Sequence, residues 1–159
     1  MLYLCRNEYG DISVNVLIVD NEIVQVENLG IGLSSRGYHV LQALSGLEAL
    51  NLIENDANQI DLVITDYAMP GINGMELLQN IRLRHGDLPV ILMTAYGERD
   101  IVLDALHNQC NGFIDKPFTL EGLLHEIGRV RAAADLPATL GISGEPRQNK
   151  PPLPVVLAP

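Results

Sequence analysis

The sequence of 159 residues is poor in basic side chains, with ten Lys and Arg against twenty Asp and Glu and a formal net charge of −10. Binding to nucleic-acid phosphates needs clustered Lys and Arg, so this balance argues against a nucleic-acid-binding domain. The two cysteines, Cys5 and Cys110, lie far apart and near no histidine-rich spacing, which argues against a disulfide or a zinc site. An acidic chain of this kind is expected to bind cations or a basic partner.

Long apolar runs are also missing from the sequence. No apolar stretch reaches the roughly 20 residues that a membrane-spanning helix needs. The N-terminus has no basic segment followed by an apolar run, which is the pattern of a secretory signal. We therefore expect a cytoplasmic protein with no membrane contact. The hydrophobic fraction of 47% and the charged fraction of 19% are typical of a folded domain with its own core.

Five short segments have the composition of β-strands, and three of them are nearly continuous aliphatic runs. Such runs are typical of parallel strands that are covered on both faces. The strands are predicted at residues 14–19, 38–43, 61–65, 89–94 and 112–115. Helical patterns alternate with them, over residues 22–35, from Ser45, from Asn73, over residues 98–108 and from Thr119. This alternation predicts an α/β domain over residues 14–134, a doubly wound five-stranded parallel sheet with helices on both faces.

Two segments lie outside this pattern. Residues 1–13 show no clear periodicity and are expected to form an N-terminal extension. Residues 135–159 contain six of the nine prolines and end in KPPLPVVLAP, which is typical of extended polyproline-like chain. They are predicted to form a disordered proline-rich tail or linker.

Polar side chains stand where four of the predicted strands end. Asp20 and Asn21 follow the first strand, Asp66 the third, Thr94 ends the fourth and Lys116 follows the fifth. Because ligands of open α/β sheets bind at the carboxyl ends of the strands, we expect these side chains to converge. Crowded carboxylates favour a Mg²⁺ ion, while a hydroxyl and an ammonium bind phosphoryl oxygens. One aspartate is then expected to be a nucleophile that forms an aspartyl phosphate.

Four segments of the sequence resemble the receiver domain of two-component response regulators: VLIVDNE, LVITDYAMPGINGMELLQNIR, PVILMTAYG and GFIDKPF. The resemblance extends from residue 14 to about residue 131, and its most specific part is Asp-x-x-Met-Pro-x-x-x-Gly followed by Thr-Ala and Lys-Pro. It implies the flavodoxin-like strand order 2-1-3-4-5. It also implies a phosphorylation-dependent signalling switch, which is not an enzyme but assists its own phosphorylation and dephosphorylation.

Carried over position by position, the resemblance makes Asp66 the phosphoacceptor. Its phosphoryl group would come from a histidine kinase or a phosphotransfer protein. The ligands of Mg²⁺ would be Asp20, Asp66 and the backbone oxygen of Ala68. Thr94 and Lys116 would contact the phosphoryl group.

The resemblance further implies a switch formed by Thr94 and Phe113, in which the aromatic ring turns inward as the threonine moves. The change would reach a downstream protein, an output domain or a second copy of the chain through the face of the fourth helix, fifth strand and fifth helix. Without the other motifs, Phe113 would be interpreted as a plain core aromatic. A cis peptide bond between Lys116 and Pro117 is also expected.

The sequence departs from the family at Asn21, where a second acid usually stands and binds the metal. An amide still offers an oxygen but carries no charge, so Asn21 is expected to be a weakened ligand. Glu22 is expected to favour the start of the first helix instead. Asn21 is the one feature that supports an alternative function, a degenerate receiver that binds partners without being phosphorylated.

A second alternative is a phosphatase resembling the haloacid dehalogenase superfamily. Asp20 and Glu22 would then be nucleophile and acid, while Thr94 and Lys116 would hold the phosphate. That family needs a further acid pair at a strand end after the lysine, where this sequence has a helix. It would also leave Asp66 and the loop that follows it without a role.

Overall fold

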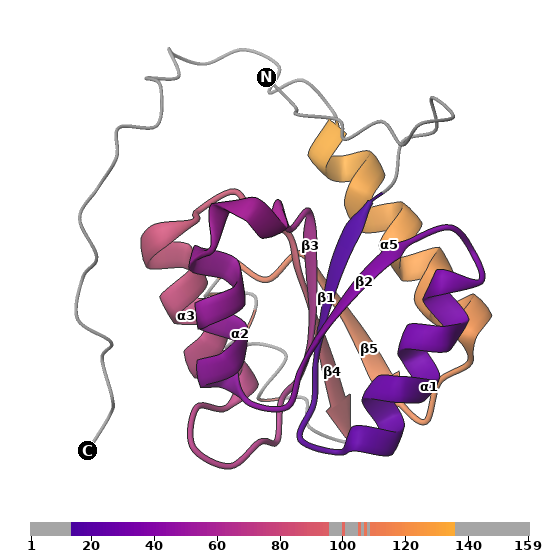
Figure 1. Ribbon diagram of the computed structural model, residues 1–159, viewed down its shortest axis with the longest axis horizontal. Coiled ribbons are helices and arrows are strands. Elements are labelled where there is room, and N and C mark those ends of the chain that lie inside the picture. Colours follow the sequence, from indigo (N-terminus) through magenta and orange to yellow (C-terminus); the bar gives the residue numbers. More distant parts are fainter. Residues whose placement is uncertain (1–13, 96–99, 101–104, 106, 108, 136–159) are drawn as a thin grey trace.

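The computed structural model describes residues 14–95, 100, 105, 107 and 109–135. Its single sheet has five strands: β1 (Asn15–Val19), β2 (His39–Ala43), β3 (Leu62–Asp66), β4 (Val90–Ala95) and β5 (Gly112–Lys116). Neighbouring strands are all parallel, in the order β2-β1-β3-β4-β5 (Figure 1). The predicted parallel sheet and its strand order are confirmed.

Within the described residues the α-helices are α1 (Ile23–Ser34), α2 (Gly46–Glu54), α3 (Gly74–Arg84) and α5 (Leu120–Asp135), with a short 3-10 helix η1 (Asp56–Asn58). Most of the predicted helix over residues 98–108 lies outside the described residues, as do the predicted extension over residues 1–13 and the tail from residue 136 onward. No helix in the described part of the chain is both long and apolar enough to cross a membrane.

Two helices begin with capping motifs at the carboxyl edge of the sheet, at the predicted helix starts Ser45 and Asn73. Asn73 and Glu76 form a complete capping box before α3, in which each side chain accepts the other residue's backbone N–H at 2.9 Å. Before α2 only half of the box forms. The Ser45 hydroxyl accepts the N–H of Glu48 at 3.1 Å, but the Glu48 carboxylate accepts the N–H of Leu44 instead of that of Ser45. These bonds fix the loops that follow β2 and β3.

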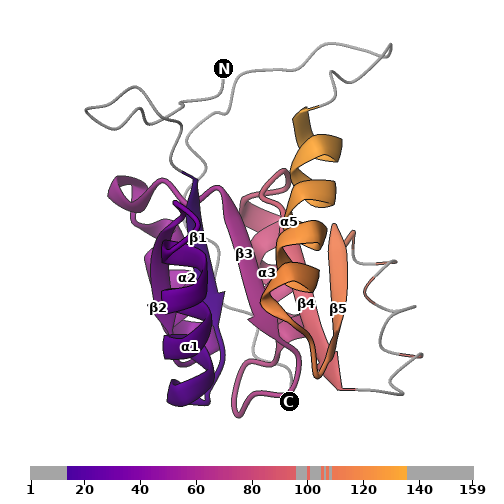
Figure 2. The same cartoon turned by 90° about the vertical axis from the view of Figure 1, so that its right-hand side faces the viewer.

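The helices form one layer on each face of the sheet, with α2 and α3 on one side and α1 and α5 on the other (Figures 1 and 2). Side chains of β1 alternate between the layers. Leu17 and Val19 pack with α2 and α3, whereas Val16 and Ile18 pack with α1 and α5. Strands β1 and β3 are buried throughout, and β4 is buried up to its last residue, as their aliphatic runs predict. This double burial holds the carboxyl ends of the central strands in fixed positions.

Candidate functional site

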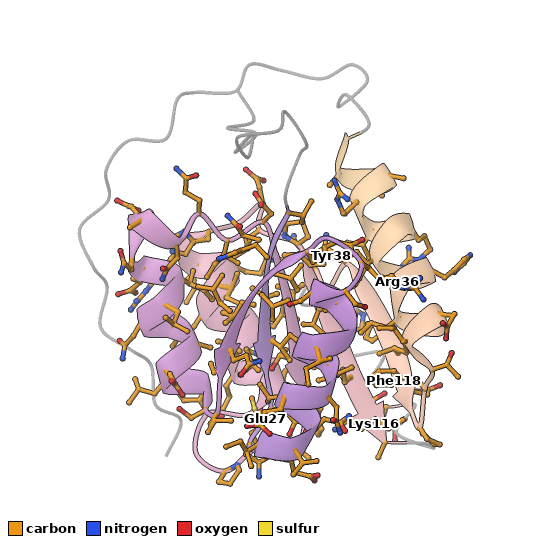
Figure 3. All side chains as sticks on the ribbon, turned by 45° about the vertical axis from the view of Figure 1, so that its right-hand side comes forward. Glu27, Arg36, Tyr38, Lys116 and Phe118 are labelled. Atoms are coloured by element: carbon orange, nitrogen blue, oxygen red, sulfur yellow. The ribbon has the colours of Figure 1, made fainter. Side chains whose placement is uncertain are left out.

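The predicted site residues meet at the carboxyl edge of the sheet. Asp66 and Lys116 are the last residues of β3 and β5, Asp20 directly follows β1, and Thr94 is the second-last residue of β4. Figure 3 shows Lys116 at the end of the sheet where β5 stops. Since parallel strands all end at the same edge, buried strands deliver these polar groups to one place.

Lys116 joins the two carboxylates of the site. Its Nζ lies 3.1 Å from Oδ2 of Asp20 and 2.9 Å from Oδ1 of Asp66. The side chain of Asp20 has no exposed surface, while 10% of that of Asp66 and 25% of that of Lys116 remain exposed. A fully buried carboxylate is tolerated only when it is paired and hydrogen-bonded, so Lys116 is part of what allows Asp20 to be buried.

Asp20 also holds the start of α1. Its Oδ1 accepts the backbone N–H of Glu22 at 2.9 Å, and its own N–H donates to the carbonyl of Ala43 in β2 at 3.2 Å. Glu22 itself is the N-cap residue of α1, and its side chain makes no capping hydrogen bond. The carboxylate that accepts a hydrogen bond at the start of α1 is therefore Asp20. The favourable effect of the Glu22 charge on this helix end stays a prediction.

Burial and ion pairing shift the pKa values of Asp66 and Lys116. Burial raises the pKa of Asp66, and the hydrogen bond and charge of Lys116 offset only part of that rise. Burial acts to lower the pKa of Lys116, but its bonds to Asp66 and Asp20 outweigh it, so that the pKa of Lys116 is raised. The site therefore holds a protonated Lys116 next to Asp66, and burial opposes the ionisation of Asp66.

Thr94 is buried at the same edge, but its hydroxyl is bonded to a residue that the sequence analysis did not select. Oγ1 of Thr94 donates to Oδ1 of Asp115 at 3.1 Å. The two residues are direct partners in the β4–β5 register. The side chains of residues in register on neighbouring parallel strands point to the same face of the sheet. Asp115 can therefore be identified as the partner of Thr94 only once the β4–β5 register is known.

The other two predicted metal ligands, Ala68 and Asn21, lie within two residues of Asp66 and Asp20 in the sequence. Ala68 lies in the loop after β3, two residues beyond Asp66, and Asn21 directly follows Asp20. Both are exposed. The Lys116–Pro117 peptide bond is cis, as the resemblance implied.

Phe113 lies in β5 opposite Leu92 and is half-buried. Its backbone N–H donates to Oε1 of Glu126 in α5 at 3.0 Å. The carboxylate of Glu126 also pairs with Arg129, and this hydrogen bond lowers the pKa of Glu126 below its ordinary value. The strand that carries Phe113 is thus tied to α5 through one carboxylate.

The two carboxylates fit a shared divalent cation. Asp20 and Asp66 already converge on one cationic group, the ammonium of Lys116. Among the residues that the structure describes, no group of three or more His, Cys, Asp or Glu side chains could hold a metal ion. Mg²⁺ usually takes one or two carboxylates and keeps several waters, so two carboxylates and a backbone oxygen form a suitable donor set.

An open cavity of about 390 Å³ lies beside Lys116. It is lined by Gln25 of α1, Ala95 of β4, Lys116, Pro117 and Phe118. Neither Asp20 nor Asp66 is among the lining residues, so the cavity adjoins the site only through Lys116.

The strand order together with Asp66 and Lys116 joined at the carboxyl edge defines the class of response regulator receivers. The family model described as the response regulator receiver domain matches residues 16–128. The chain belongs to this family, and the resemblance found in the sequence is confirmed.

Relatives of this chain include whole regulators and a kinase. Over 122 residues the chain is 39% identical to response regulator MprA of Mycobacterium sp. (strain KMS). This match covers 75% of the present chain and 50% of MprA. Over 112 residues the chain is 37% identical to sensor kinase CckA of Brucella abortus (strain 2308), covering 70% of this chain and 12% of the kinase. The chain therefore spans half or less of these curated relatives.

Solved structures of receiver domains match over nearly their full length. A receiver domain protein of Clostridium thermocellum superposes with a TM-score of 0.73 at 30% identity, covering 77% of this chain and 98% of the other. Chemotaxis response regulator CheY4 of Vibrio cholerae gives a TM-score of 0.69 at 28% identity, covering 74% and 98%. The described residues thus have the fold of receiver domains.

Proposed function

We propose that this chain is a phosphorylation-dependent signalling switch whose Asp66 accepts a phosphoryl group from a histidine kinase or phosphotransfer protein. The observation that carries this function is the ammonium of Lys116 held 2.9 Å from Oδ1 of Asp66 at the carboxyl edge of a receiver fold. A carboxylate oxygen of Asp66 attacks the phosphorus, the bond from phosphorus to the donor nitrogen breaks, and its electron pair leaves with the donor imidazole. The product is an aspartyl phosphate.

Accessibility favours Asp66 over Asp20 as the nucleophile. The side chain of Asp20 has no exposed surface, and its two oxygens accept bonds from Glu22 and Lys116. Asp66 keeps part of its side chain exposed, so a phosphorus atom can approach it. This difference also argues against the phosphatase alternative, which needs Asp20 as its nucleophile.

The other site residues stabilise the phosphoryl group. Lys116 keeps its positive charge and pairs with phosphoryl oxygens, while the Thr94 hydroxyl donates a hydrogen bond to them. Asp20, Asp66 and the carbonyl of Ala68 would hold Mg²⁺, with Asn21 as a weaker ligand. When bound, Mg²⁺ supplies positive charge that offsets the repulsion between the carboxylates and the incoming phosphoryl group. The acceptor is part of the chain itself, so the domain assists its own phosphorylation without being an enzyme that acts on a separate substrate.

The signal is carried by a two-state change in β5 and its neighbours. Thr94 moves toward the phosphoryl group and Phe113 turns inward with it. The surface formed by the helix predicted over residues 98–108, β5 and α5 then presents a different face to an output domain, a downstream protein or a second copy of the chain. Since β5 is bonded to α5 through the N–H of Phe113 and the carboxylate of Glu126, a shift of this strand is transmitted to the helix.

Intact-mass measurement after incubation with acetyl phosphate and Mg²⁺ tests this function. The wild-type chain should gain the mass of one phosphoryl group, and Asp66→Asn should gain none while keeping its fold by circular dichroism. Asp56→Asn, at an exposed position in η1, is the matched control and should behave as wild type. A folded wild-type chain that stays unmodified would support the degenerate receiver instead. Modification that is lost in Asp20→Asn but kept in Asp66→Asn would reassign the nucleophile.

A further inference from the structure

The hydroxyl of Thr94 is engaged in a bond that the proposed switch has to break. Its Oγ1 lies 3.1 Å from Oδ1 of Asp115, which faces it directly across the β4–β5 pairing. Thr94 is 1% exposed, whereas Asp115 lies on the edge strand and is exposed to solvent. A buried hydroxyl is thus hydrogen-bonded to a solvated carboxylate, one residue before Lys116.

The chemistry of a hydroxyl makes this bond exclusive. Threonine carries a single O–H donor, whereas the ammonium of a lysine carries three N–H donors. Lys116 can therefore bond Asp20, Asp66 and a phosphoryl oxygen at the same time. Thr94 has one proton to donate, and both the carboxylate of Asp115 and the phosphoryl oxygens are acceptors. Its hydroxyl bonds one or the other.

We propose that Asp115 is a positioning residue that competes with the phosphoryl group for the hydroxyl of Thr94 and holds the switch in its resting state. This role presupposes the proposed phosphorylation of Asp66. Release of Thr94 leaves the carboxylate of Asp115 free to be hydrated, because this residue is exposed. A hydrogen bond to a charged but solvated group shifts such an equilibrium by about threefold to tenfold. Asp115 therefore sets a modest threshold for activation.

Asp115 has a second effect, which any test must separate from the first. Its negative charge repels every anion at the site, whether or not Thr94 is bonded to it. The charge effect persists when the hydroxyl is removed, but the competition for the hydroxyl does not. A double-mutant cycle with Thr94→Val, which removes the hydroxyl, isolates the competition.

The experiment measures Mg²⁺-dependent binding of beryllofluoride, a non-covalent mimic of the phosphoryl group, by two-dimensional NMR. The wild type, Asp115→Ala, Thr94→Val and the double variant are compared. Asp115→Ala should tighten binding about fivefold when Thr94 is present and by a clearly smaller factor in the Thr94→Val background. Asp115→Asn keeps a hydrogen-bond acceptor without the charge, so its affinity for beryllofluoride should lie between those of the wild type and Asp115→Ala. It also replaces Asp115→Ala if that variant fails to fold.

Urea unfolding of the same four chains without phosphodonor provides an independent readout. In the unphosphorylated protein the bond is present, so the destabilisation caused by the two substitutions together should be smaller than the sum of their separate effects. Two results would overturn the role of Asp115 in a wild type that still gains phosphate. One is strict additivity of the two losses in unfolding free energy, and the other is an equal effect of Asp115→Ala on beryllofluoride affinity with and without the Thr94 hydroxyl. A wild type that neither binds beryllofluoride nor gains phosphate would refute the proposed function, and this role of Asp115 with it.

Discussion

The ammonium of Lys116 lies 3.1 Å from Oδ2 of Asp20, a residue whose side chain has no exposed surface. The same ammonium reaches Asp66, so one cation neutralises part of the charge of two acids. In the absence of other cations, the lysine is therefore a structural counter-ion as well as the proposed partner of the phosphoryl group.

Lys116→Met should destabilise the fold, because it leaves the buried carboxylate of Asp20 without its charged partner. We expect a loss of about 2 kcal/mol in the free energy of unfolding, discounted from the value for a fully buried pair because Lys116 is partly exposed. Added Mg²⁺ should stabilise this variant more than the wild type, since a cation replaces the missing charge. Urea unfolding with and without Mg²⁺ measures both effects. Arg36→Met, which breaks an exposed ion pair with Glu121, is the control. Its free energy of unfolding should fall by at most about 1 kcal/mol, and Mg²⁺ should not stabilise it more than the wild type.

Asn21→Asp should tighten Mg²⁺ binding about tenfold. A carboxylate at this position adds one negative charge a few ångströms from the cation, worth up to about 4 kcal/mol at an effective dielectric constant near 20. Solvent screening at this exposed residue reduces the net gain to about 1–2 kcal/mol. Isothermal titration calorimetry measures the affinity. Asn28→Asp makes the same change at an exposed position farther along α1 and should leave the affinity nearly unchanged. Equal effects of the two substitutions would exclude Asn21 from the metal site.

Glu126→Gln should lower stability at neutral pH but not in acid. The pKa of Glu126 is lowered in the folded chain, chiefly by its hydrogen bond with Arg129. A carboxylate with a lowered pKa stabilises the fold above its unfolded pKa of about 4.3, and this contribution is lost as the pH falls through the folded value. Urea unfolding should show a loss of about 1 kcal/mol at pH 7 that shrinks on acidification below about pH 4. If the difference in unfolding free energy between the variant and the wild type does not depend on pH, the charge of Glu126 contributes nothing to stability.

Two glycine-to-alanine substitutions should change stability in opposite directions. A Cβ on Gly112 would lie 2.5 Å from Oε1 of Glu126 and 2.8 Å from Cγ2 of Val130, so Gly112→Ala should cost about 1–3 kcal/mol. A Cβ on Gly128 meets no atom within 4 Å, and this residue lies inside α5. Gly128→Ala should therefore stabilise the fold by about 0.5–1 kcal/mol, as alanine does in helix interiors. Thermal unfolding of both variants would detect the contrast. A Gly112→Ala variant as stable as the wild type would show that the side chains of Glu126 and Val130 can move aside without loss of stability.

The sheet and the convergence of the site residues could be predicted from the sequence. Aliphatic runs such as Val16–Val19 mark buried parallel strands, and such strands bring whatever follows them to one edge. The resemblance supplied the strand order, which alternation of strands and helices alone leaves open.

The detailed bonding of the site could not be predicted. Which side chain faces Thr94 depends on the β4–β5 register, and a slip of one residue would turn Asp115 to the other face of the sheet. The bond from the N–H of Glu22 to Asp20 depends on the backbone path into α1, which the sequence does not reveal. The partial capping box at Ser45 has the same cause, because Glu48 bonds the N–H that the local backbone brings within reach.

The contact between Asp20 and Lys116 joins residues that are 96 positions apart in the sequence. Contacts of such long range form only after the intervening chain has been ordered. During synthesis on the ribosome, Asp20 and Asp66 both emerge before their shared counter-ion. A nascent chain that stops before β5 therefore carries two uncompensated acids at the edge of its sheet, one of them in a position that the finished fold buries. Charge balance at this edge arrives only with β5, so the site is assembled after the other four strands of the sheet and before α5.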